Sequence, residues 1–144
     1  MGYYTTHYLD IVVPKKYRSV FEVLSEDETK HKIFEAFFSE EGEDFMLMDW
    51  TCSSYEPGKL PAEEKFPKYF KGFLLDPPKG YETLTITFEF KYDFPQDGLM
   101  KFLLKHSQGK ALLIAGGCQV SDESESKAHY HVLFETPGIE KMKK

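Results

Sequence analysis

Two histidines near the C-terminal end of the chain are the residues whose type and spacing first suggest chemistry. His129 and His131 flank Tyr130 in the stretch AHYHVLFE, which covers residues 128–135. In an extended strand, residues two apart face the same way and lie about 6.5–7 Å apart along the backbone. Two neutral imidazoles at that separation can chelate one divalent cation. The stretch therefore offers a candidate metal site at His129 and His131.

The same three residues resemble the motif of HUH endonucleases, in which a His-hydrophobic-His pair on a ferredoxin-like sheet holds a divalent metal while a tyrosine attacks DNA. In the replication-initiator branch the resemblance implies a tyrosine after the motif, but no tyrosine follows His131 here. In the relaxase branch it implies an N-terminal tyrosine and a third histidine. The residues that fit these two roles are Tyr3, Tyr4 and Tyr8, and His7 and His106. A solvated histidine pair on a strand is the simpler interpretation.

Charge narrows the range of partners. The chain carries 24 acidic residues against 18 Lys and Arg, which gives a formal net charge of −6. Such a chain repels a phosphate backbone unless a basic patch is segregated, so nucleic acid is a disfavoured partner. Cys52 and Cys118 are too far apart in sequence for a CxxC site, and two cysteines make no disulfide framework. With no apolar run of about 20 residues to span a bilayer, we expect a cytoplasmic protein without a membrane partner.

The acidic residues are concentrated in one segment. Ten of them fall between Glu22 and Asp49, against two lysines. The segment is either a solvated helix face or a patch that steers a basic protein into contact. Under the second interpretation, rings near the patch anchor the partner. The predicted partner-binding residues are Glu26, Asp27, Glu40, Glu41, Glu43 and Asp44, with Trp50 and Tyr55 as anchors.

Lysines alternate with rings at one place only, the stretch KFPKYFKGF. Such a pattern can stack single-stranded bases on rings and contact phosphates through lysines. The residues that would do so are Lys65, Phe66, Lys68, Tyr69, Phe70 and Lys71. The alternative, which we favour, is that the rings pack on the core and the lysines point to water.

Hydrophobic periodicity predicts a single α+β domain over residues 1–144. Strands are expected at 6–14, 45–52, 81–92, 110–120 and 127–135, and helices at 15–24, 25–42 and from 95 to 106. Residues 53–80 hold five of the eight prolines, and this composition predicts a long Pro-rich loop. This order predicts a ferredoxin-like sandwich, an antiparallel sheet with helices on one face, extended by a C-terminal hairpin strand.

Alternation assigns faces to two of these strands. In 81–92 the apolar positions face a core, and the threonines of 83–87 lie on an open sheet face. In 128–135 strict alternation puts Val132 and Phe134 on the apolar face, and His129, His131 and Leu133 on the outward face.

The composition and the acidic segment together predict a non-enzymatic binding domain that inhibits or antagonises a basic protein target. Small acidic immunity proteins and phage anti-defence proteins share this composition, which is an analogy and not a family match. No cofactor is expected. A divalent metal belongs only to the alternative of an HUH-type nuclease, and the Lys-aromatic stretch only to the alternative of a single-strand nucleic-acid binder.

Overall fold

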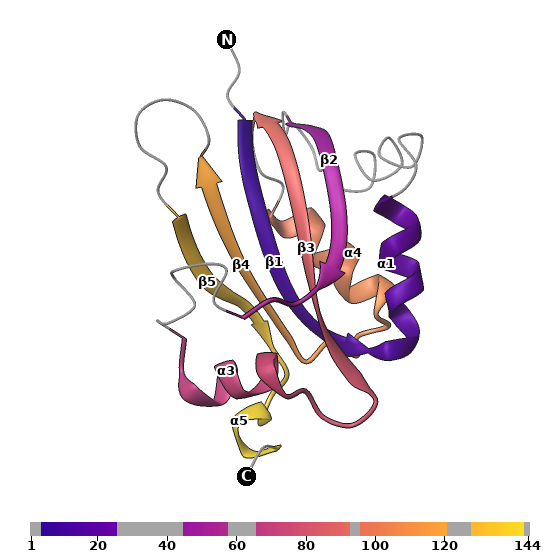
Figure 1. The fold of residues 1–144 in the computed structure, drawn as a ribbon, viewed down its shortest axis with the longest axis vertical. Coiled ribbons are helices and arrows are strands. Elements are labelled where there is room, and N and C mark those ends of the chain that lie inside the picture. The colour runs from indigo at the N-terminus through magenta and orange to yellow at the C-terminus, as the bar shows by residue number, and fades with distance from the viewer. Residues whose placement is uncertain (1–3, 26–44, 58–65, 93–95, 121–127, 143–144) are drawn as a thin grey trace.

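The structure, a computed structural model, describes residues 4–25, 45–57, 66–92, 96–120 and 128–142. These residues form an α+β fold around an open antiparallel sheet of five strands, in the order β2-β3-β1-β4-β5 (Figure 1). The strands are β1 Tyr4–Pro14, β2 Phe45–Ser54, β3 Tyr81–Tyr92, β4 Leu113–Val120 and β5 Ala128–Glu135. All five expected strands are therefore present.

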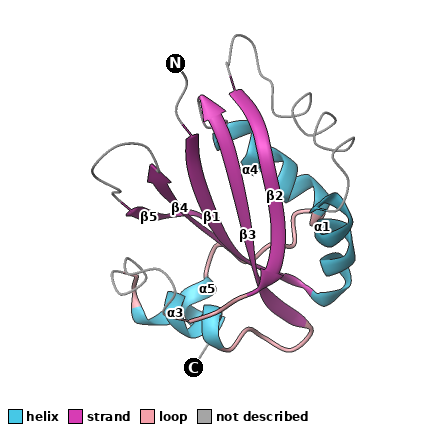
Figure 2. Ribbon diagram, turned by 45° about the horizontal axis from the view of Figure 1, so that its top comes forward, coloured by secondary structure: helices cyan, strands magenta, loops and turns pink. Residues whose placement is uncertain are grey.

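Four α-helices and one 3-10 turn accompany the sheet among the described residues. They are a turn at Lys15–Tyr17, α1 Arg18–Ser25, α3 Lys68–Leu75, α4 Gln96–His106 and α5 Ile139–Met142. Figure 2 shows α1 and α4 on one side of the sheet, and α3 and α5 near its other end. The expected helix at 25–42 lies outside the described residues.

Apolar side chains make a separate core on each face of the sheet. The first core joins α1 and α4 to one face through Phe21, Leu99 and Phe102, against Leu9 and Ile11 of β1. The second core joins α3 and α5 to the opposite face through residues grouped around Val12 of β1. Its members are Val12, Phe66, Phe70, Phe73, Leu74, Leu112, Leu113, Ala115 and Ile139. Helices thus lie on both faces, which corrects the expectation of helices on one face only.

The open part of the second face is smaller than the sequence predicts. Thr85, Thr87 and Glu89 are half-exposed, as expected for a solvated face. Thr83 is buried, and its hydroxyl donates a hydrogen bond of 2.8 Å to the carbonyl of Leu74 in α3. Helix α3 therefore covers the beginning of β3 and leaves the rest of its threonine face accessible.

Helix α3 interrupts the region predicted to be a loop at 53–80. Phe66, Phe70, Phe73 and Leu74 recur at helical spacing, and all four are buried in the second core. Pro67 directly precedes the first helical turn, a place where its missing N–H costs no hydrogen bond. The prolines led the sequence interpretation to overlook a short amphipathic helix.

Both edge strands contain an irregularity. The register of β2 shifts between Leu47 and Asp49, and that of β5 shifts so that Val132 and Phe134 pair with consecutive residues of β4. The extra residue in β5 is Leu133, which packs against the first core together with Phe134, while Val132 is exposed. Strict alternation through 128–135 is therefore wrong at this point. Bulges in edge strands discourage pairing with a further strand.

No helix within the described ranges has the length and apolar character needed to cross a membrane.

Candidate functional site

A surface groove of about 340 Å³ lies where the end of β2, the C-terminal end of α3 and the beginning of β3 meet. Its apolar lining consists of rings, prolines and leucines, namely Tyr55, Pro57, Leu74, Leu75, Pro77 and Tyr81. Its polar lining consists of Lys15, Ser54, Glu82 and Thr83.

Hydrogen bonds hold the walls of the groove in place. The Tyr55 N–H donates to the carbonyl of Thr83 at 3.3 Å, which ties the segment after β2 to β3. The Lys15 N–H donates to the carbonyl of Gly80 at 2.9 Å. Gly80 has a φ of +87°, a conformation that glycine adopts without strain, and it forms the tight turn into β3. The groove is thus built on paired backbone and not on loose connections.

The exposed residues at the groove and next to it in sequence include a leucine and two acidic residues. Leu75 is 60% exposed, whereas Tyr55 is half-buried and packs partly against the second core. Glu56 and Asp76 are exposed, and each stands in the sequence between two lining residues. The groove therefore has an apolar bed with one strongly exposed leucine, and the carboxylate that belongs to its lining is that of Glu82.

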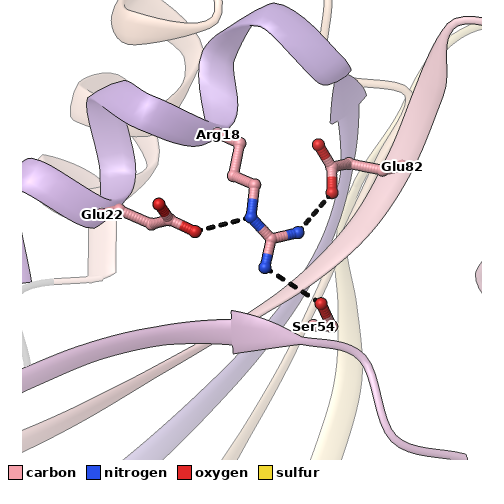
Figure 3. A network of polar contacts seen from close by, with 4 residues as sticks. All are labelled: Arg18, Glu22, Ser54 and Glu82. Atoms are coloured by element: carbon pink, nitrogen blue, oxygen red, sulfur yellow. Dashed lines mark hydrogen bonds and ion pairs between the residues drawn. The ribbon is translucent and has the colours of Figure 1, made fainter.

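An arginine fixes the polar end of the groove (Figure 3). Arg18 of α1 donates from Nη1 to Oε1 of Glu82 at 2.6 Å and from Nη2 to Oγ of Ser54 at 3.0 Å. Its Nε donates to Oε1 of Glu22, one helical turn away, at 2.5 Å. The hydrogen bonds to Glu22 and Glu82 raise the pKa of the Arg18 guanidinium above its ordinary value. Three elements, α1, β2 and β3, are joined through this one side chain.

The structure separates the two anchors predicted from sequence. Tyr55 lines the groove. Trp50 is fully buried in the first core, where its ring packs edge-on against Phe88 and its Nε1–H donates to the carbonyl of Phe21 at 3.3 Å. A side chain without exposed surface cannot touch a partner in this conformation, so the assignment of Trp50 as an anchor is corrected. The predicted acidic residues Glu26, Asp27, Glu40, Glu41, Glu43 and Asp44 lie outside the described residues.

The rings of the Lys-aromatic stretch point into the protein. Phe66 and Phe70 are buried with their ring centroids 4.6 Å apart, and they are not accessible for stacking bases. The Tyr69 hydroxyl donates to Glu135 at 2.7 Å, and this hydrogen bond raises the pKa of Tyr69 to about 12. Lys68 is exposed and Lys71 half-exposed, while Lys65 is outside the described residues. The stretch has the arrangement that we favoured, with rings in the core.

For the histidine pair, the structure describes the backbone only. The register places His129 opposite Cys118 and His131 opposite Gly116. Because Leu9 also pairs with Gly116 and belongs to the first core, both histidines occupy positions on the first-core face. The bulge at Leu133 explains the difference from the outward face that strict alternation predicts. Tyr4 and Tyr8, two of the possible nucleophiles, occupy positions on the opposite face of β1.

His7, a possible third ligand, pairs with Cys118 across β1 and β4. It is 3% exposed, and burial lowers its pKa to about 4. His106, the other possible ligand, lies at the end of α4, where burial and then the charge of Lys105 lower its pKa. Considering only the part of the chain that the structure describes, no three His, Cys, Asp or Glu side chains are grouped to hold a metal ion.

Sequence reasoning missed the groove as a site, although a signal for it exists. Its two walls contain the tripeptides Tyr55-Glu56-Pro57 and Leu75-Asp76-Pro77, each an apolar residue, an acid and a proline. The two tripeptides are far apart in sequence, so only the fold brings them to one groove. Comparisons with protein-family models, with curated proteins and with solved structures found no match for this chain.

Proposed function

We propose that this protein is a non-enzymatic binding domain that inhibits or antagonises a basic protein target. The groove at Tyr55 is the observation that carries the proposal. It offers a partner an apolar bed with a strongly exposed leucine, Leu75, and two exposed acidic residues, Glu56 and Asp76, are sequence neighbours of its lining residues. Aromatic and apolar anchors that fill such sites supply most of the binding energy of an interface, while charges around them steer the encounter.

The charge of the whole chain supports a basic partner. At a net charge of −6, the protein attracts positively charged surfaces over distances set by the ionic strength. The acidic segment at 22–49 holds ten of the 24 acids and adds a second region with the same preference. We infer that the groove provides specificity and that the acidic segment accelerates association.

Photo-crosslinking from the groove tests this function. A benzophenone amino acid replaces Leu75 in the full chain, and the protein is irradiated in extract from its source cells. We expect a discrete crosslinked protein with a basic isoelectric point. The purified partner should then bind the unmodified chain with an affinity that falls as salt is added.

The control uses Met142, an apolar side chain that is 56% exposed and lies outside the groove lining. The same benzophenone residue at position 142 should not capture the partner. Equal capture from both positions, an acidic partner, or binding that ignores salt would each contradict the proposal.

We further propose that the fold is ferredoxin-like and extended by β5. The order β2-β3-β1-β4 agrees with the split β-α-β arrangement, in which each helical crossover skips one strand. Helices α1 and α4, which would be the two crossovers, share the first core. For location we propose the cytoplasm, where thiols such as that of Cys52 stay reduced.

A further inference from the structure

We draw no further inference here: the strongest candidate, the accessible patch on the second face of the sheet where Asp49 of β2 stands directly opposite Glu89 of β3, is an acidic pair on its own, and nothing in the structure shows what covers it.

Discussion

The hydroxyl of Thr85 on β3 donates a hydrogen bond of 2.7 Å to the carboxylate of Asp10 on the neighbouring strand β1. The two residues stand directly opposite each other in the register, on the face that carries the second core. Asp10 is only 1% exposed. A buried carboxylate without hydrogen bonds is strongly destabilising, so Thr85 contributes to the stability of the central strand through Asp10.

Replacing Thr85 by alanine should therefore lower the free energy of unfolding by about 1–3 kcal/mol, because it removes a donor from a buried charge. Chemical denaturation measures this difference. The control is Thr87→Ala, two residues along the same half-exposed face, which should change stability by less than about 0.5 kcal/mol. If the two variants proved equally stable, the hydrogen bond to Asp10 would have no energetic weight.

Arg18 joins α1 to the sheet through contacts with Glu82 and Ser54. These side chains are partly exposed, so water screens the ion pair and each contact is weak. We expect Arg18→Ala to lower the free energy of unfolding by about 1 kcal/mol, through the sum of three contacts. Arg18→Lys should recover little of this, since an ammonium group lacks the planar fork. A loss no larger than that of the exposed control Lys110→Ala would contradict this role.

The burial of His7 makes the free energy of unfolding depend on pH. Burial lowers its pKa from 6.5 to about 4, so the unfolded chain binds a proton more readily than the folded chain between these two values. Stability from this group is full above about pH 6.5 and is lost as the pH falls toward 4. Over that window the wild type should lose about 2–3 kcal/mol more than His7→Gln. Urea denaturation at several pH values measures the free energy of unfolding of both proteins. If this free energy fell equally in the two proteins between pH 6.5 and pH 4, the effect of His7 would be refuted.

The regular elements could be predicted from sequence because their signals are local. Strand β3 alternates without interruption, and Leu84, Ile86 and Phe88 are all fully buried as predicted. Helix α4 begins just after Pro95 and ends before Gly109. These are the residues that the sequence predicts to start and stop this helix. Each of these signals depends only on spacing along the chain.

The features that escaped prediction depend on contacts between distant residues. The bulge at Leu133 follows from how β5 pairs with β4, and it moves the histidine pair to the other face. Tryptophan is a residue type common in interfaces, which led to the prediction of Trp50 as an anchor. Its place opposite Phe88 in the register buries it instead. Likewise the groove joins residues 54–57 to residues 74–83 through the fold alone. Composition and periodicity carry no information about these pairings.

A metal titration distinguishes the binding domain from the nuclease alternative. We expect zinc or magnesium to leave the thermal midpoint unchanged, and His129→Ala with His131→Ala to change stability by no more than about 0.5 kcal/mol. A bound cation would instead raise the midpoint by mass action. Because the register aligns His7, Cys118 and His129 across three strands, Cys118→Ser belongs in the same series. A rise in midpoint that these variants abolish would replace our proposal with a metal site.

Charge reversal in the acidic segment tests how the partner is recruited. Exposed charges act on the rate of encounter over roughly the Debye length of 8 Å at physiological salt, whereas anchors such as Tyr55 control dissociation. Reversing Glu26, Asp27, Glu40 and Glu41 should therefore slow association with the crosslinked partner and flatten its salt dependence, with little change in the dissociation rate. Leu75→Ser should do the opposite, since it acts on the apolar bed. Stopped-flow or surface-based kinetics measure both rates. If charge reversal left association unchanged at low salt, the segment would be a solvated face and the groove alone would account for binding.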